Sequence, residues 1–257
     1  MPTVLTRRDG AVLTITLNRP DAYNAFTREL HAELHAALTG EAAEPEVRAV
    51  VITGAGKGFC AGQDVRELGA LPGSIRDALE QTYHPNVRAI RSLEKPVLAA
   101  VNGAAAGAGL SLACACDVRV AADAATFVPG FAGIGLVPDS GGTWFVHRLL
   151  GYARAFEWMS TNRRLTAQEA LEWGLVSEVV PAHAFATRVA ELGASWAALP
   201  TRALALTKRL LEHAATASLD EQLALEAELQ ELATRSDDFR EGVAAFLEKR
   251  APQFRGA

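Results

Sequence analysis

Apolar and polar residues alternate at the start of the chain and then repeat at helical spacing. Residues 4–17 contain two short β-rich runs on either side of Asp9-Gly10, a dipeptide that accepts the positive φ of a hairpin turn. After this predicted hairpin, a leucine stands at every fourth position between residues 30 and 38, with charged or polar residues between them. This pattern predicts an amphipathic helix, and Thr27 is its expected N-cap.

Continuous apolar runs further along the chain indicate buried strands. Residues 47–53 and 96–101 are two such runs, and each is followed by a glycine-containing loop. A run of this kind is typical of a parallel strand covered on both faces, and helical patterns lie between the runs. Strand, glycine-rich loop and helix patterns recur at residues 118–122 and 127–150, so the sequence predicts an α/β core with crossover connections.

Helical patterns predominate from Thr166 to the end of the chain. Thr166 and Ser218 are each followed by a glutamate three positions later, which predicts a capping box at a helix start. Pro200 is the expected boundary between a core of residues 1–200 and a helical module of residues 201–257. The apolar stripes of this module exceed what one helix buries on a compact core, so they are expected to pack on the core or on a second copy of the chain. Their leucines are Leu204, Leu206, Leu210, Leu211, Leu223, Leu225 and Leu229.

The composition is that of a globular protein with one large domain, or one domain and an appendage. The chain has 257 residues, of which 49% are hydrophobic and 21% are charged. Lysine and arginine total 25 while aspartate and glutamate total 30, which gives a net charge of −5. Because this charge has the wrong sign for binding phosphate backbones, nucleic acid is not expected as a partner.

No membrane or export segment is expected. The longest apolar stretches, near residues 97–101 and 104–115, are interrupted by glycine and polar residues, so no membrane span is predicted. Residues 1–9 carry charged side chains and no signal-peptide-like apolar stretch, which favours a cytoplasmic location. The three cysteines, an odd number in apolar or small-residue surroundings, are expected to be reduced and buried, and their spacing indicates no metal site.

Two glycine-rich loops are the strongest candidates for chemistry. They span residues 54–64 (GAGKGFCAGQD) and 102–109 (NGAAAGAG), each after an apolar strand, and each is expected to lead directly into a helix. Either loop alone is more simply interpreted as a tight turn, and Gly107 and Gly109 do not complete a dinucleotide-binding fingerprint. Two such loops on neighbouring strands, however, bring main-chain N–H groups together, which favours an oxyanion hole.

Segments along essentially the whole chain resemble signatures of the enoyl-CoA hydratase/isomerase (crotonase) family. Their order and spacing also match the family. The matching segments are LNRPDAYNAF (17–26), FCAGQDV (59–65), VNGAAAGAGLSLACACD (101–117), GIGLVPDSGGTW (133–144), LTAQEALEWGLV (165–176) and FREGVAAFLEKRAPQF (239–254). Within the family, PDSGGTW and the C-terminal run are most similar to isomerases of phenylacetate degradation, which act on a ring epoxide of a CoA thioester.

The resemblance implies a ClpP-like spiral of ββα turns with terminal helices that build a homotrimer, or a hexamer of paired trimers. It implies an acyl-CoA thioester as substrate, with coenzyme A as part of that substrate and with neither a separate cofactor nor a metal. The thioester oxygen would accept hydrogen bonds from two main-chain N–H groups, which correspond by position to Gln63 and Ala108.

The resemblance also indicates which of the family's acidic catalytic residues this chain has. Hydratases of the family position a water with two glutamates, and the matching positions here hold Ser111 and Phe131, which places ordinary hydration in doubt. Asp139 stands where isomerases carry a single acidic base. Local sequence alone favours Asp139 as a helix N-cap, whereas the family match favours it as the base. The apolar residues expected to desolvate it are Phe131, Ile134, Leu136 and Val137.

Further positions are expected to contact coenzyme A or to border the site. The main chain at Ala22, Ala61 and Gln63 would approach coenzyme A, and the cations Arg66 and Lys249 would meet its phosphates unless they are ordinary solvated side chains. Residues with other expectations are Asp64 and Asp117 (structural), His84 (border of the acyl pocket), His147 (pocket or surface) and Cys60 (buried, with no role).

Three functions are consistent with these residues. The leading hypothesis is a cofactor-independent CoA-thioester isomerase that forms an enolate, acting on a ring epoxide of phenylacetyl-CoA and on 3-enoyl-CoA. The alternatives are an enoyl-CoA hydratase with an acid at another position, and a catalytically silent acyl-CoA-binding protein of the same fold. The sequence does not identify the acyl chain.

Overall fold

Six strands form the larger of two sheets in the computed structural model, which describes residues 1–64, 66–67 and 74–257. The strand order is β1-β2-β3-β5-β7-β10. The first two strands pair antiparallel, and each later neighbour pairs parallel. The predicted hairpin and the predicted parallel strands are therefore confirmed. The bounds are β1 Val4–Asp9, β2 Val12–Leu17, β3 Ala49–Gly54, β5 Val97–Val101, β7 Val118–Ala122 and β10 Glu178–Val180.

Both faces of this sheet are covered, which explains its continuous apolar strands. Val50 and Ile52 of β3 point into the main core beneath helices, whereas Val51 points to a second core on the opposite face. The second core includes Phe185 of helix α8 (Ala182–Ala197). Because alternate side chains enter two different cores, neither face of the strand favours polar residues.

Short strands form a second sheet in the order β4-β6-β8-β9. Their bounds are β4 Gly58–Cys60, β6 Ala104–Ala106, β8 Thr126–Val128 and β9 Leu165–Thr166. Three of them directly follow a strand of the larger sheet, so long strand, short strand and helix repeat along the chain. This is the ββα spiral that the family resemblance implied.

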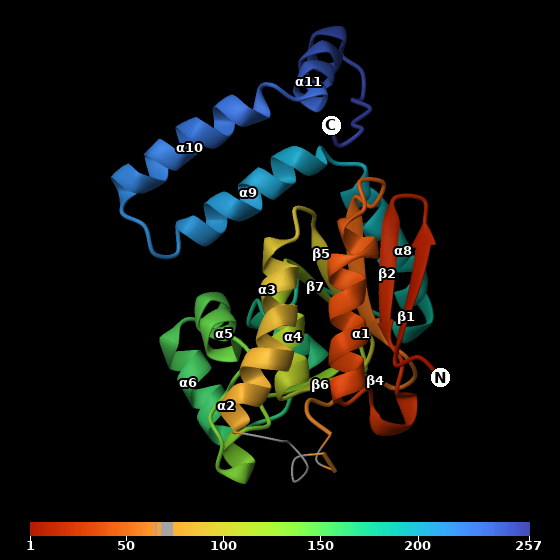
Figure 1. Cartoon of the computed structure of the whole chain (residues 1–257), viewed down its shortest axis with the longest axis vertical. Helices are drawn as coiled ribbons and strands as arrows, with labels where there is room; N and C mark the ends of the chain where they lie inside the picture. Colours follow the sequence, from red (N-terminus) through yellow and green to blue (C-terminus); the bar gives the residue numbers. More distant parts are fainter. Residues whose placement is uncertain (65, 68–73) are drawn as a thin grey trace.

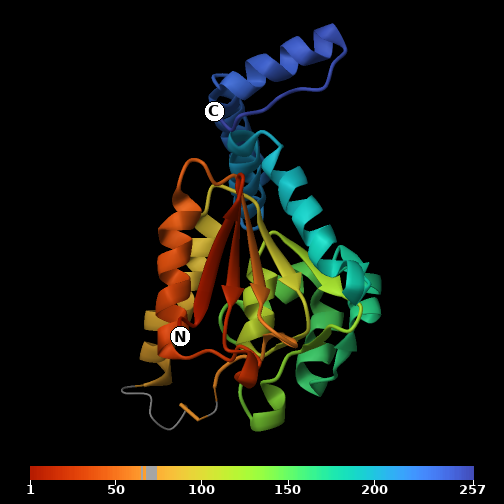
Figure 2. The same cartoon turned by 90° about the vertical axis from the view of Figure 1, so that its right-hand side faces the viewer.

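Helices cover the main-core face of the larger sheet (Figures 1 and 2). Helix α1 begins where expected, because the Thr27 hydroxyl accepts a hydrogen bond from Leu30 N at 3.2 Å. The predicted capping box at Thr166 also forms, with Glu169. The bounds are η1 Pro20–Ala22, α1 Arg28–Thr39, η2 Glu41–Ala43, α2 Ile75–Ala78, the π-helix η4 Leu79–Tyr83, α3 His84–Ser92, α4 Ala108–Ala115, η5 Ala132–Ile134, α5 Gly142–Leu150, α6 Tyr152–Thr161 and α7 Ala167–Glu172.

Three helices extend from one end of the core: α9 (Thr201–His213), α10 (Leu219–Ala233) and α11 (Asp237–Glu248) (Figures 1 and 2). The guanidinium of Arg48 connects them to the core by donating to Thr201 Oγ1 (3.0 Å) and to the carbonyls of Leu199 (2.7 Å) and Phe254 (2.8 Å). Several of their apolar side chains remain exposed within one chain. Within the described ranges, no helix has the length and apolar character needed to cross a membrane.

Candidate active site

The first glycine-rich loop is held beside the start of α4 by a β-bridge to Phe26. Phe26 N donates to Gly62 O (2.7 Å) and Asp64 N donates to Phe26 O (3.0 Å), which leaves Gln63 N on the other side of the loop. Gly62 has φ +86°, and a Cβ there would lie 2.9 Å from Ala106 O and 3.3 Å from Ala108 N. Only glycine allows this approach. The helix expected directly after this loop falls in a segment outside the described residues.

The second loop presents the first N–H group of a helix at the same place. Gly107, with φ +53°, is the N-cap of α4, and Ala108 is the first helical residue. The main-chain N–H groups of Gln63 and Ala108 have no hydrogen-bond partner among residues 1–64, 66–67 and 74–257. Two unpaired donors beside the positive end of a helix dipole form a site for an anionic oxygen. The structure therefore brings these two predicted residues together.

Asp139 lies just before α5 and near the same elements, since its carbonyl accepts a hydrogen bond from Ser111 of α4 (3.0 Å) and its charge acts on Tyr83. Burial raises the pKa of its carboxyl, while a 2.9 Å hydrogen bond donated by Ser140 Oγ and the nearby His84 lower it, and the net shift is upward. The N-cap of α5 is Gly141, with φ +79°, so the interpretation of Asp139 as an N-cap is wrong. Its carbonyl instead accepts Gly142 N at 2.8 Å in the turn that precedes the helix.

Most of the apolar residues expected to desolvate Asp139 are exposed within one chain, whereas both residues at the hydratase positions are buried. Phe131 is buried, but Ile134 and Val137 are 65% and 79% exposed, so the apolar run does not shield the carboxylate within one chain as expected. This run includes η5 and the residues that follow it, and no other described part of the chain covers it. At the other hydratase position, Ser111 is buried on α4 and its hydroxyl donates to Asp139 O at 3.0 Å.

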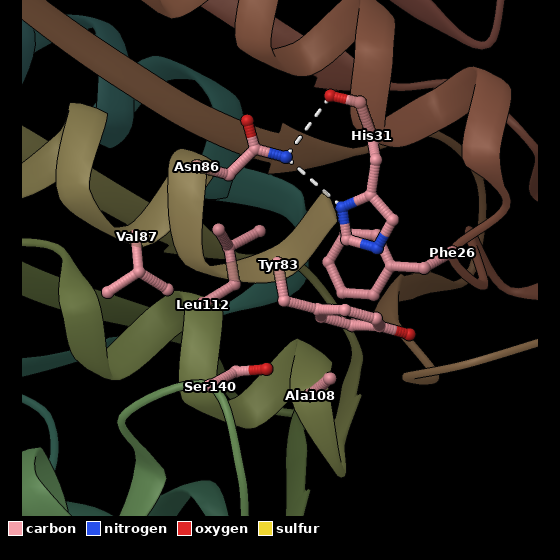
Figure 3. Close-up of a pocket in the computed structure, with 8 residues that line it drawn as sticks. All are labelled: Phe26, His31, Tyr83, Asn86, Val87, Ala108, Leu112 and Ser140. Atoms are coloured by element: carbon pink, nitrogen blue, oxygen red, sulfur yellow. Dashed lines mark hydrogen bonds between the residues drawn. The ribbon is translucent and has the colours of Figure 1, made fainter. Parts of the chain in front are cut away.

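A pocket lined mostly by apolar and aromatic residues lies between α1, η4, α3, α4 and the segment before α5 (Figure 3). Sequence reasoning missed its central residue, Tyr83, whose hydroxyl donates to Gln63 Oε1. Burial, and then the negative charge of Asp139, raise the pKa of Tyr83, so its hydroxyl stays protonated. The only sequence signal was the neighbouring His84-Pro85 pair. The pocket is lined by Phe26, His31, Tyr83, Asn86, Val87, Ala108, Leu112 and Ser140.

The residues expected to contact coenzyme A divide into two groups. Ala61 N donates to Tyr23 O (3.0 Å), which places the turn containing Ala22 beside the first loop. Arg66 lies on the same side, with its side chain 71% exposed and its guanidinium bonded to both carboxylate oxygens of Asp64 (2.9 and 2.7 Å).

Lys249 does not join this group within one chain. It is the exposed C-cap of α11, which lies at the opposite end of the molecule from the two loops (Figures 1 and 2). The structure therefore brings Arg66 and the two alanines to one place and leaves Lys249 elsewhere.

The remaining candidates have ordinary environments. Asp117 accepts hydrogen bonds from Val97 N (2.9 Å), Arg91 (3.0 Å) and Lys208 (2.9 Å), in agreement with a structural role. His84 is half-buried near Asp139, and His147 is exposed on α5. Burial raises the pKa of the Cys60 thiol to about 12, so nothing activates it as a nucleophile.

The spiral of ββα units thus places two main-chain donors, unpaired among the described residues, near a buried serine and a half-buried carboxylate. The sequence profile described as enoyl-CoA hydratase/isomerase matches residues 7–257. The chain therefore belongs to the enoyl-CoA hydratase/isomerase family of CoA-thioester enzymes.

Relatives named as isomerases and relatives named as hydratases are both similar to this chain. It is 44% identical over 260 residues to the 1,2-epoxyphenylacetyl-CoA isomerase of Escherichia coli (strain K12), covering 100% of this chain and 99% of the relative. It is 46% identical over 246 residues to a probable enoyl-CoA hydratase of Rhodobacter capsulatus, covering 94% and 93%. The crystal structure of an enoyl-CoA hydratase from Bacillus anthracis has a TM-score of 0.94 at 34% identity, with 99% and 100% covered. Family membership alone thus does not choose between isomerisation and hydration.

Proposed function

We propose that this protein is a CoA-thioester isomerase that needs no separate cofactor and acts on 1,2-epoxyphenylacetyl-CoA, with 3-enoyl-CoA as a second substrate. The observation that carries the proposal is the half-buried carboxylate of Asp139 near two main-chain donors that are unpaired among the described residues, while Ser111 and Phe131 supply no acid at the hydratase positions. The 44% identity to an isomerase of this name supports the choice of substrate.

Isomerisation of a 3-enoyl thioester needs one base that removes a proton and returns it elsewhere. The Asp139 carboxylate would take the proton from the α carbon, and the electron pair would move onto the thioester oxygen as an enolate. The N–H groups of Gln63 and Ala108 would hold that oxygen, and each such donor contributes on the order of 10²- to 10³-fold in rate. Protonated Asp139 would then deliver its proton to the γ carbon, so that the double bond moves and the carboxylate is restored.

The epoxide substrate would use the same groups differently. Asp139 would assist opening of the ring epoxide, and expansion of the carbocycle would incorporate the epoxide oxygen into the larger ring. The substrate and product have the same atoms, so no water or redox partner enters. Burial raises the pKa of this carboxyl, which makes its carboxylate a stronger proton acceptor than that of an ordinary aspartate and suits it to this role.

Binding of coenzyme A would involve more than one copy of the chain. Arg66 and the main chain at Ala22 and Ala61 lie on the side of the oxyanion loops, whereas Lys249 lies at the opposite end. Lys249 would therefore reach coenzyme A only from a second copy. We propose a homotrimer or a pair of trimers, in which exposed apolar side chains of the terminal helices pack on a neighbouring copy.

Product analysis with three thioesters tests the proposed reaction. The protein is incubated separately with ring-epoxide phenylacetyl-CoA, 3-enoyl-CoA and 2-enoyl-CoA. The products are separated by chromatography, and their masses are measured by mass spectrometry. Isomerisation leaves the mass unchanged and alters retention, whereas hydration adds the mass of one water. Conversion of the first two substrates supports the proposal. Faster hydration of 2-enoyl-CoA than isomerisation of either substrate would identify a hydratase, and binding without any turnover would identify a silent protein.

A further inference from the structure

A π-turn directs Tyr83 into the site. Residues 75–92 form one helical stretch in which the π-helix η4 (Leu79–Tyr83) separates α2 from α3. Pro85, early in α3, has no N–H to donate to the preceding turn, and its ring would clash with a carbonyl four residues earlier. The π-turn accommodates this and shifts the helical register, and π-turns are frequent at functional sites. Tyr83, the last residue of the π-turn, is buried, while Glu80 and Gln81 are exposed.

Two neutral rings hold the Tyr83 ring in place (Figure 3). Phe26 stacks on His31 with ring centroids 4.4 Å apart, and the edge of Tyr83 packs against both, at 5.6 and 4.1 Å. His31 is anchored by Asn86, whose amide nitrogen lies 3.1 Å from His31 Nδ1 and 3.1 Å from its carbonyl. Burial lowers the pKa of His31 to about 3, so this cluster carries no charge at neutral pH.

The hydroxyl of Tyr83 connects this cluster to the first oxyanion loop. It donates to Gln63 Oε1, while Gln63 Nε2 donates to Asp64 O at 3.2 Å. The main chain of Gln63 is bridged to Phe26, which also belongs to the aromatic cluster. Gln63 is therefore tied to the same cluster by its main chain and by its side chain.

We infer that Tyr83 is a positioning residue, whose hydroxyl fixes Gln63 so that the Gln63 N–H stays aimed beside the Ala108 N–H as enolate charge develops. The inference rests on the proposed function. Donors stabilise a developing charge only when they need not reorient, and displacements of about 1 Å cost on the order of 10²-fold in rate. Tyr83 acts through Gln63 and not on the reacting atoms.

A double-mutant cycle tests this inference. Tyr83→Phe removes only the hydroxyl, and Gln63→Met removes the acceptor but keeps the main-chain N–H. Each single variant is expected to lower kcat for 3-enoyl-CoA by about fivefold to tenfold with KM within about twofold, as for loss of one hydrogen bond. The double variant is expected to be no slower than the slower single variant, because both changes break the same bond. Tyr152→Phe is the matched control, since this tyrosine is 71% exposed and its hydroxyl has no partner in the described part of the chain.

Bound acetoacetyl-CoA gives a second readout that does not depend on turnover. Its enolate absorbs in the near ultraviolet, so the enolate fraction of the bound ligand reports the strength of the oxyanion hole. That fraction is expected to fall in Tyr83→Phe and in Gln63→Met and to stay unchanged in Tyr152→Phe, at saturating ligand and with unchanged thermal stability. If Tyr83→Phe does not fold, Gln63→Met alone decides by the same measurement.

The outcomes separate this inference from the proposed function. An active wild type with kcat and enolate fraction unchanged in Tyr83→Phe, or with effects that multiply in the double variant, overturns the positioning role alone. A wild type that isomerises neither substrate overturns the proposed function, and the enolate fraction still decides whether Tyr83 supports the oxyanion hole.

Discussion

Ser111 and Asp139 are joined by a hydrogen bond of 3.0 Å from the serine hydroxyl to the aspartate main-chain carbonyl. Ser111 is buried on α4, three residues after Ala108, and Asp139 precedes α5. By family resemblance, Ser111 stands where hydratases carry a glutamate. The side chain at this position thus holds the segment that contains Asp139, and supplies no second acid.

Replacing Asp139 by asparagine tests the proposed base. Asp139→Asn should lower kcat for 3-enoyl-CoA by about 10²- to 10⁴-fold, because the amide cannot accept the substrate proton. The fold should persist, because Asp139 is not the N-cap of α5 and Ser140 can still donate to the amide oxygen. Retention of more than about a tenth of wild-type kcat, with normal coenzyme A binding, would contradict the mechanism.

The pH profile of the wild type checks the same assignment. The carboxylate form is active, so kcat/KM should fall on acidification through the pKa of Asp139. Burial raises that pKa, so the midpoint should lie above the value of about 3.9 typical of a free aspartate. The residual activity of Asp139→Asn should lack this acid limb. An identical limb in both proteins would assign it to another group.

Removing the Ser111 hydroxyl should affect turnover more than binding. Ser111→Ala takes away one of the two hydrogen bonds to Asp139 O, since Gly142 N also donates to it at 2.8 Å. We expect kcat to fall by about threefold to tenfold and KM to stay within about twofold. Ser195→Ala is the control, because that hydroxyl also donates to a main-chain carbonyl (Leu192 O, 2.8 Å) but Ser195 is exposed on α8. Equal kcat in Ser111→Ala and wild type would remove Ser111 from the positioning of Asp139.

Features encoded by neighbouring residues were predictable from the sequence. Asp9-Gly10 turns the hairpin, Thr27 caps α1, and the two glycine-rich loops meet where Gly62 lies against Ala108. Each depends on local backbone conformation or on the alternation of strand and helix, which single-sequence patterns report directly.

Features that depend on a choice between neighbouring caps or on distant packing were not predictable. The N-cap of α5 is Gly141 and not Asp139, because the chain takes a positive φ at Gly141 to enter the helix. Tyr83 was missed because its partners, Gln63, His31 and Phe26, are 20 or more positions away along the chain. The apolar run after Phe131 is exposed, although its hydrophobic composition favoured burial beside Asp139.

Coenzyme A affinity should depend on two cations and on salt. Arg66→Ala and Lys249→Ala should each weaken binding by about twofold to fivefold, as for exposed ion pairs, and kcat should change less. Ionic strength should weaken wild-type binding more than binding to either variant. Arg7→Ala, which changes an equally charged and 83% exposed side chain on β1, should have no effect. Equal calorimetric affinities in all four proteins would exclude both residues from the site.

The assembly should be a trimer or a pair of trimers. Leu223 and Phe246 on the terminal helices are 52% and 83% exposed within one chain. Light scattering should therefore give three or six times the chain mass of 27.3 kDa. Phe246→Glu should weaken association, whereas Leu5→Glu on β1 should not. A stable, fully active monomer at assay concentration would contradict this prediction.

Acidification should destabilise the fold through His31. This ring is buried, and its pKa is lowered to about 3 in the folded state, against about 6.5 when exposed. Between these values the unfolded chain binds a proton that the folded chain does not, so the free energy of unfolding falls as the pH is lowered through this window. From pH 7 to pH 5 the loss from this residue is about 2 kcal/mol. His31→Phe keeps an aromatic ring against Phe26 and Tyr83, and Asn86 retains its bonds to the carbonyls of residues 31 and 82.

Urea unfolding at fixed protein concentration measures this effect. The decrease in the free energy of unfolding between pH 7 and pH 5 should be smaller in His31→Phe than in wild type by about that amount, even though the variant is less stable at pH 7. His183→Phe, which replaces an exposed histidine on α8, should show the wild-type decrease. Equal decreases in wild type and His31→Phe would show that His31 is already protonated in the folded protein at pH 5. The aromatic cluster around Tyr83 would then carry a charge at pH 5.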